Sequence, residues 1–193
     1  MSENLNVPAT DLSLPPRQLT RARTWTGDTE WYTPPDILEA AHEVLGAIDL
    51  DPASSDAQQA LSPIKAAIYF TVENSGLDRP WRGRIWLNPP YARGWIDRFV
   101  EKMVQSYRDR EMQAGIMLTN SATETNWWQT AAGACEALCF RKGRVRFLKM
   151  TDGALSTGGS SPSHPHTLFY FGPNTAGFVR VFRRFGLVFS GPL

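Results

Sequence analysis

The chain has 193 residues, of which 42% are hydrophobic, and a formal net charge of +1. This length suits one domain with a real core, and the charge excludes a protein that is cationic all over. Its two cysteines, Cys135 and Cys139, cannot complete a four-ligand zinc site, so we expect reduced thiols and no metal. No apolar run reaches the roughly 20 residues that span a bilayer, and no signal-peptide pattern opens the chain. We therefore expect a cytoplasmic protein without a membrane span.

The first part of the chain differs in composition from the rest. Residues 1–24 hold scattered Pro and Arg without apolar periodicity, which predicts a flexible N-terminal arm before a single domain over 25–193. The domain opens with "WYTPPDILEAAHEVLG", whose apolar residues recur at helical spacing. This pattern predicts a helix over about 35–45, with Thr33 as a possible N-cap and Gly46 as the stop.

Apolar runs typical of strands and amphipathic stretches typical of helices alternate along the rest of the chain. Strands are predicted in "AIDLDP", "AAIYFT", "RIWLN" and "AGIMLTN", and helices in "GWIDRFVEKMVQSY" and "TETNWWQTAAGA". "EALCFRKGRVRFL" predicts two strands around a turn at Lys142-Gly143, "GALSTGGSSPSHPH" a loop, "TLFYFG" a buried strand, and "TAGFVRVFRRFGLVFS" a short helix and a last strand. The order predicts a three-layer α/β domain, with a mostly parallel sheet and an antiparallel C-terminal hairpin.

Two polar motifs follow predicted strands, where ligands gather in open α/β sheets. One is "DLDPASS", in which Asp49 and Asp51 can accept hydrogen bonds from hydroxyl or amino groups of a small cofactor. Alternatively, Asp51 caps a following helix with Pro52 in its first turn. The spacing alone leaves both interpretations open.

The other motif is "NPPY", which follows the apolar run "GRIWL". Two prolines supply no backbone donors, so the strand must stop at Asn88. The Asn88 amide and the Pro89 carbonyl are two acceptors that can hold both hydrogens of an exocyclic amine, and Tyr91 offers a ring for a base to stack on. That arrangement suits attack by the amine on an electrophilic methyl group, although a plain strand-ending turn explains the same residues.

The ordered set "EWYTPPDILEAA", "IDLDPASS", "GLDRPWRGRIWLNPPY", "TETNWW", "CFRKGRVRF" and "FYFG" resembles the phage-encoded DNA N-6-adenine methyltransferase (Dam) family over roughly residues 30–190. The resemblance implies a Rossmann-like methyltransferase fold, S-adenosylmethionine as cofactor and adenine in DNA as substrate. It further implies a phage or prophage gene whose product shields DNA from restriction.

The resemblance also assigns roles to single residues. The catalytic tetrapeptide corresponds to Asn88, Pro89, Pro90 and Tyr91. Cofactor contacts are expected first from Asp51, then from Asp49, Thr33 and Pro52. Ser54 and Ser55 stand where larger amino-methyltransferases have the start of a glycine-rich loop.

A cluster of basic residues is the candidate DNA contact. Arg144 and Arg146 are expected on one face of a strand, flanked by Arg141 and Lys142, with a solvated hairpin edge as the alternative. Arg93, beside the catalytic motif, is expected to brace an extruded nucleotide, because a stacked adenine cannot reach a pocket.

The predicted function is thus site-specific methylation of adenine N6 in double-stranded DNA with the base flipped out, or in single-stranded DNA. Two alternatives remain: the same chemistry on RNA or cytosine N4, and a catalytically silent nucleic-acid-binding module. The histidines of the glycine-rich loop, His164 and His166, are expected to be polar loop groups or phosphate donors and not metal ligands.

Overall fold

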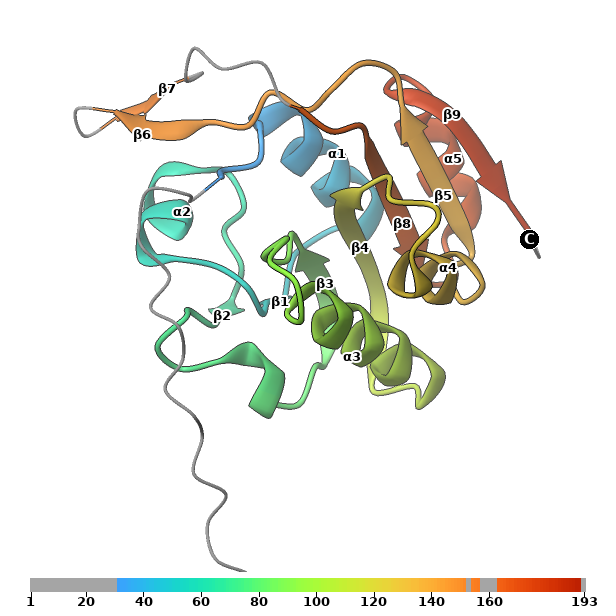
Figure 1. Ribbon diagram of the computed structural model, residues 1–193, viewed down its shortest axis with the longest axis horizontal. Helices are drawn as coiled ribbons and strands as arrows, with labels where there is room; N and C mark the ends of the chain where they lie inside the picture. Colours follow the sequence, from blue (N-terminus) through green and yellow to red (C-terminus); the bar gives the residue numbers. More distant parts are fainter. Residues whose placement is uncertain (1–30, 152–153, 157–162, 192–193) are drawn as a thin grey trace, which may run out of the picture.

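The computed structural model describes residues 31–151, 154–156 and 163–191 (Figure 1). The predicted arm, residues 1–24, lies outside these residues, as does the middle of the predicted glycine-rich loop, 157–162.

A central sheet organises the described part of the chain. Within that part it has seven strands in the order β2-β1-β3-β4-β8-β5-β9. They are β1 (Leu50–Asp51), β2 (Ile68–Tyr69), β3 (Gly83–Leu87), β4 (Met112–Asn120), β5 (Ala137–Arg141), β8 (His166–Phe171) and β9 (Gly186–Ser190). The pairs β1–β2, β1–β3 and β3–β4 are parallel, whereas β8 runs antiparallel to both β4 and β5, and β9 runs antiparallel to β5.

Helices cover both faces of this sheet. They are α1 (Pro35–Leu45), α2 (Asp56–Leu61), η2 (Gly76–Asp78), α3 (Ile96–Arg108), α4 (Asn126–Ala132) and α5 (Thr175–Phe182). Figure 1 shows α3 and α4 together on one face, while α1 and α5 pack in the core of the other. Strand β3 contributes side chains to the hydrophobic cores on both faces of the sheet. Trp86 packs in the core beneath α1, and its neighbours Ile85 and Leu87 pack in the core beneath α3. This three-layer α/β arrangement is consistent with the predicted Rossmann-like fold.

Both ends of the first helix lie where the sequence pattern predicted them, but its N-cap is not the predicted residue. It runs from Pro35 to Leu45, and Gly46 ends it with φ of 81°, a conformation that favours glycine. The N-cap position is held by Pro34, and no side chain caps the helix. Thr33 is one residue too early and is fully buried, with its hydroxyl in contact with Asn88. The prediction of Thr33 as N-cap was therefore wrong.

The connection after β1 shows whether Asp51 caps a helix, which is one of the two interpretations that the sequence leaves open. Helix α2 begins only at Asp56, and its N-cap is Ser55, whose Oγ accepts a hydrogen bond from the backbone N–H of Gln58 at 3.2 Å. Asp51 and Pro52 lie before this helix, at the end of β1. The alternative in which Asp51 caps a helix that contains Pro52 was therefore wrong.

The predicted hairpin around Lys142-Gly143 is absent from the described residues. Strand β5 ends at Arg141, and residues 144–147 belong to no strand. The reason is that β5 already pairs with β8 on one side and β9 on the other, so neither edge remains for a hairpin partner. The alternation of the predicted strand nevertheless survives, since Val145 and Phe147 are buried while Arg144 and Arg146 are exposed.

An antiparallel hairpin occurs further along the chain. It joins β6 (Lys149–Thr151) to β7 (Ala154–Ser156) and projects away from the main sheet (Figure 1). The prediction of a loop over residues 153–166 was therefore wrong for residues 154–156, which form β7.

Within the described residues, Cys135 and Cys139 are free thiols, and no group of three or more His, Cys, Asp and Glu is placed to hold a metal ion. No helix in the same residues is both long and apolar enough to cross a membrane.

Candidate active site

The carboxyl ends of β1, β3 and β4 meet at one edge of the sheet, here called the carboxyl edge, because these strands are parallel. The "NPPY" motif lies at this edge directly after β3, which ends at Leu87. The prediction that the strand stops at Asn88 is confirmed. Pro89 is buried, and Asn88 and Tyr91 are half-buried beside it. The two prolines thus hold a fixed corner between β3 and α3.

The Asn88 side chain is held by hydrogen bonds on both of its ends. Its Oδ1 accepts a hydrogen bond from the Tyr91 hydroxyl at 2.8 Å. Its Nδ2 donates to the Trp31 carbonyl and to Thr33 Oγ1, each at 3.4 Å. Because the amide nitrogen faces these two acceptors, the oxygen is directed the other way, and the orientation of the amide is fixed. Asn88 therefore presents an acceptor at the carboxyl edge.

The Tyr91 ring packs among aromatic side chains from distant parts of the chain. Its centroid lies 6.5 Å from that of Phe147 and 6.4 Å from that of His166. Its hydroxyl also lies 3.5 Å from the Leu118 carbonyl. Burial raises the pKa of the Tyr91 hydroxyl above its ordinary value, so this group stays protonated and acts as a donor.

Asp51 is a buried carboxyl with few partners. It is 1% exposed and accepts hydrogen bonds from the backbone N–H of Ala53 at 3.2 Å and from Gln59 Nε2 at 3.3 Å. A carboxylate offers about four acceptor positions, so capacity remains for further donors. Burial raises the pKa of Asp51 from 3.8 to about 7, while a hydrogen bond with Ser54 opposes the shift. The carboxyl is therefore poised to ionise when donors reach it.

The other predicted cofactor residues have different surroundings. The Asp49 carboxylate forms an ion pair with Arg84, with Nε and Nη2 of the guanidinium at 2.8 and 2.9 Å from its two oxygens. The hydrogen bond from Arg84 keeps the pKa of Asp49 below its ordinary value. Thr33 contacts Asn88, as described above. Pro52 is buried, and its carbonyl packs so closely on Gly76 that a Cβ there would overlap it.

Three of the five predicted DNA-binding residues line hollows in the surface. Arg93 is exposed and lines a cavity beside Tyr91. Arg141 and Lys142 instead line a second depression, together with Asp36 and Glu39 from α1. The Arg141 guanidinium is partly engaged locally, since its Nη1 donates to the carbonyls of Lys142 and Arg144 at 3.3 and 2.9 Å.

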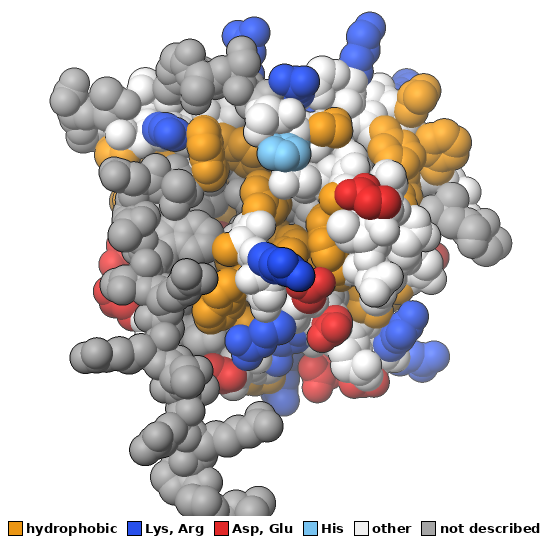
Figure 2. Space-filling model, viewed as in Figure 1, with side chains coloured by type: hydrophobic (Ala, Val, Ile, Leu, Met, Phe, Trp, Pro, Cys, Tyr) orange, Lys and Arg blue, Asp and Glu red, His pale blue; other side chains and the backbone are white. Residues whose placement is uncertain are grey.

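Residues 141–149, here called the basic segment, run from the carboxyl end of β5 to the start of β6. Figure 2 shows Lys and Arg side chains along the top of the molecule, where Figure 1 places this connection. The Val145 N–H lies 3.4 Å from His166 Nδ1, and Leu148 pairs with Tyr32 through two backbone hydrogen bonds of 2.8 and 2.9 Å. These contacts hold the basic segment at the carboxyl edge, near Asn88.

His166 is a buried neutral side chain in this region. It begins β8, is 3% exposed and contacts the rings of Phe147 and Tyr91. Burial lowers the pKa of His166 from 6.5 to about 4, with smaller contributions from the charges of Arg141 and His164. The expectation that His166 is a polar loop residue was therefore wrong.

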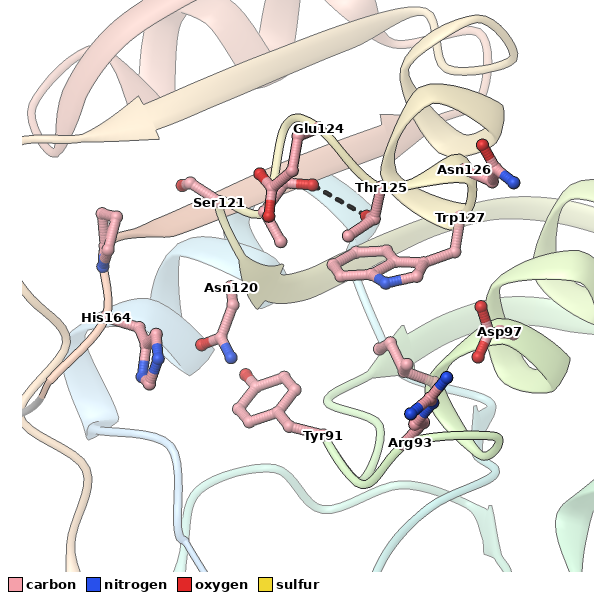
Figure 3. A pocket seen from close by; sticks show the side chains of 13 residues that line it. Tyr91, Arg93, Asp97, Asn120, Ser121, Glu124, Thr125, Asn126, Trp127 and His164 are labelled. Atoms are coloured by element: carbon pink, nitrogen blue, oxygen red, sulfur yellow. Dashed lines mark hydrogen bonds between the residues drawn. The ribbon is translucent and has the colours of Figure 1, made fainter.

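A cavity of about 750 Å³ opens at the carboxyl edge between the "NPPY" corner and the start of α4 (Figure 3). Asn120 and Trp127 line it together with Tyr91 and Arg93. Trp127 lies in "TETNWW" and Asn120 ends "AGIMLTN", but neither residue was predicted to be part of the site. A signal for Asn120 was present, because it is the polar residue that ends the buried run "AGIMLTN".

Fold and site together define an α/β protein with its polar groups gathered at the carboxyl edge of a mostly parallel sheet, where such folds bind ligands. A family model described as DNA N-6-adenine-methyltransferase (Dam) matches residues 21–173, and the chain belongs to this family. Membership implies a methyltransferase that acts on DNA. A search of curated protein sequences finds no match.

Proposed function

We propose that the protein transfers the methyl group of S-adenosylmethionine to N6 of adenine in DNA. The observation that carries the proposal is the fixed Asn88 amide, whose Oδ1 is directed toward Tyr91 by two hydrogen bonds behind it. An exocyclic amine bound there donates one hydrogen to Asn88 Oδ1 and the other to the Pro89 carbonyl. The nitrogen lone pair then lies outside the ring plane, ready to attack.

The residues at the end of β1 suit the cofactor. Asp51 is a buried carboxyl with spare acceptor capacity, and hydroxyl or amino groups of a nucleoside are donors of the kind it lacks. Asp49 is a weaker candidate, since Arg84 already occupies both of its oxygens. Thr33 and Pro52 complete the proposed surroundings. When bound, S-adenosylmethionine supplies an electrophilic methyl group.

The protein's own groups act by positioning and by electrostatics. As the amine nitrogen forms its bond to the methyl carbon, the carbon–sulfur bond of S-adenosylmethionine breaks, and the thioether S-adenosylhomocysteine is the leaving group. Positive charge develops on the nitrogen, and the two acceptors, Asn88 and Pro89, stabilise that charge until the nitrogen loses a proton to solvent. Asn88 Oδ1 has two lone pairs, so the Tyr91 hydroxyl must either share the oxygen with the amine or move away. The Tyr91 ring then provides a face on which the base stacks.

The DNA is held by cations around this site. Arg93 is exposed beside Tyr91, and Arg144 and Arg146 are exposed on the basic segment. We assign phosphate contacts to these three and a smaller share to Arg141 and Lys142, which lie around another depression. A duplex must release the target adenine from its stack, whereas a single strand presents it directly.

The test is to identify the methylated base. Defined double-stranded and single-stranded DNAs, and an RNA of the same sequence, are incubated with methyl-labelled S-adenosylmethionine and digested to nucleosides. We expect label in N6-methyladenine from DNA. Label in N4-methylcytosine or in RNA would support the alternative substrates, and no label in any nucleoside would support a silent binding module.

A further inference from the structure

Two aromatic rings face the cavity at the carboxyl edge from opposite sides. Figure 3 shows Tyr91 on one side and Trp127 on the other, with the Asn120 amide at the margin between them. At about 750 Å³, the cavity is within the size range of small-ligand sites. Two aromatic walls and one amide are the groups that proteins use to hold an unstacked base.

The start of α4 explains why Trp127 reaches the cavity. The hydroxyl of the N-cap, Thr125, donates to the Ala122 carbonyl at 2.7 Å, the hydrogen bond dashed in Figure 3, and accepts from the backbone N–H of Trp128 at 3.4 Å. Trp128 is 6% exposed and stacks on Phe140 at 5.9 Å. Because successive helical residues point in different directions, burial of Trp128 leaves Trp127 directed toward the cavity.

Asn120 differs from its neighbours at the end of β4. Thr119 Oγ1 lies 3.0 Å from the Asn120 carbonyl, and Ser121 Oγ lies 2.7 Å from Thr167 Oγ1, so both hydroxyls are engaged. Within the described part of the chain, the Asn120 side chain makes no hydrogen bond, although it lines the cavity. Its backbone is fixed by pairing with His166 in β8. The Asn120 backbone is therefore fixed at the cavity, and among the described residues its side-chain amide has a donor and an acceptor without partners.

We propose that this cavity receives a purine released from its stack, that Trp127 is the second stacking wall opposite Tyr91, and that Asn120 donates to a ring nitrogen beside the amine. The proposal rests on the proposed function, since the amine is the group that Asn88 holds. In adenine, the ring nitrogens N1 and N7 are acceptors close to the amine. Guanine presents a carbonyl in place of the amine, so it does not satisfy Asn88.

Trp127 is tested by binding, without methyl transfer. The probes are two labelled single-stranded oligonucleotides that differ only in one adenine or an abasic site, and the readout is fluorescence anisotropy. Stacking predicts that Trp127→Ala lowers the preference for adenine over the abasic site by about 5- to 150-fold, while Trp127→Phe retains most of it. Trp95 is the matched control, since it is also half-buried but does not line the cavity. An unchanged preference in folded Trp127→Ala, or no preference in the wild type, would overturn the proposal.

Asn120 is tested with base analogues. Oligonucleotides carrying 1-deazaadenine or 7-deazaadenine each lack one ring acceptor. We expect the wild type to bind one of them about 2- to 10-fold more weakly than adenine, and Asn120→Ala to show no further reduction with that analogue. Fully additive reductions from the two changes would show that Asn120 does not contact either nitrogen.

A wrong cavity assignment can be distinguished from a wrong proposed function. If the wild type methylates adenine and Trp127→Ala leaves both binding and methylation unchanged, the cavity assignment is wrong and the proposed function stands. If no base is methylated but the adenine preference depends on Trp127, the cavity assignment stands and the proposed function is wrong.

Discussion

The Tyr91 hydroxyl donates a hydrogen bond of 2.8 Å to Asn88 Oδ1, so the side chain proposed to stack on the target base also covers the acceptor proposed to hold its amine. Binding of the amine must therefore compete with the Tyr91 hydroxyl or use the second lone pair of the same oxygen. The two roles of Tyr91 can be separated by mutation.

Tyr91→Phe keeps the ring and removes the competing donor. We expect the turnover rate to stay within about fivefold of the wild type or to rise, since one net hydrogen bond is worth about 1 kcal/mol. Tyr91→Ala should instead weaken capture of the base by about 1 to 3 kcal/mol, because the stacking surface is removed. Steady-state kinetics on a defined DNA measures both. A Tyr91→Phe protein as impaired as Tyr91→Ala would show that the hydroxyl itself is needed.

Asn88→Ala removes one of the two acceptors at the reacting nitrogen. Because the proposed cofactor and phosphate contacts lie elsewhere, affinity for both ligands should change little. The turnover rate should fall by about 10²-fold or more, as when a positioned electrostatic group is deleted. The matched control is Gln113→Ala, which removes an exposed side-chain amide near the other end of β4. Undiminished single-turnover rates in folded Asn88→Ala would contradict the mechanism.

Asp51 couples cofactor binding to pH. Hydrogen bonds from the cofactor favour the ionised carboxylate, and the pKa of Asp51 without ligand is about 7, so binding at pH 6 to 7 should release a proton. Affinity should accordingly weaken as the pH falls below 7. Asp51→Ala should weaken binding by about 1.5 to 3 kcal/mol. Calorimetry in two buffers of different ionisation enthalpy measures affinity and proton release; the same values for Asp51→Ala and wild type would remove Asp51 from the site.

Stability against pH contains two opposing contributions. Asp51 has a folded-state pKa of about 7, above 3.8, so the folded state keeps a proton that the unfolded chain loses, and stability falls as pH rises between these values. His166 has a folded-state pKa of about 4, below 6.5. Between these values the unfolded chain binds a proton that the folded state does not bind, so stability falls as pH drops. Between about pH 4.5 and 6 the two slopes should cancel.

Single substitutions should reveal the separate contributions of Asp51 and His166 to the pH dependence of stability. Relative to wild type, the free energy of unfolding of Asp51→Asn should rise with pH in this window, and that of His166→Asn should fall, each by up to about 1.4 kcal/mol per pH unit. Urea denaturation at pH 4.5, 5.25 and 6 provides the measurement. Parallel curves for wild type and both variants would mean that neither buried group governs stability there.

The basic segment should determine the salt dependence of DNA binding. Replacing Arg144 and Arg146 by Gln should weaken binding to all sequences and lower the slope of log K against log salt by about one unit for each phosphate that is no longer neutralised. The matched control replaces Arg82 and Arg108, which are exposed near the amino ends of β3 and β4. The control should keep the wild-type slope. An unchanged slope in the Arg144 and Arg146 variant would leave these residues as a solvated surface.

The sequence by itself determined the features that depend only on residues close to one another along the chain. Apolar spacing and Gly46 defined α1 as residues 35–45, because helix periodicity and left-handed backbone are local properties. The two prolines ended β3 at Leu87, since they lack backbone donors. The alternation of exposed Arg and buried Val and Phe over residues 144–147 also held, although no strand forms there.

Only the tertiary structure decided how these pieces meet. Asp49 is bound by Arg84, 35 residues away, and Asn88 by Thr33, 55 residues away. No local pattern specifies such partners, because they depend on which strands become neighbours in the sheet. The same holds for β5, whose two edges are filled by β8 and β9. It holds for the cavity as well, where "NPPY", the end of β4 and the start of α4 are brought together by parallel strands whose carboxyl ends share one edge.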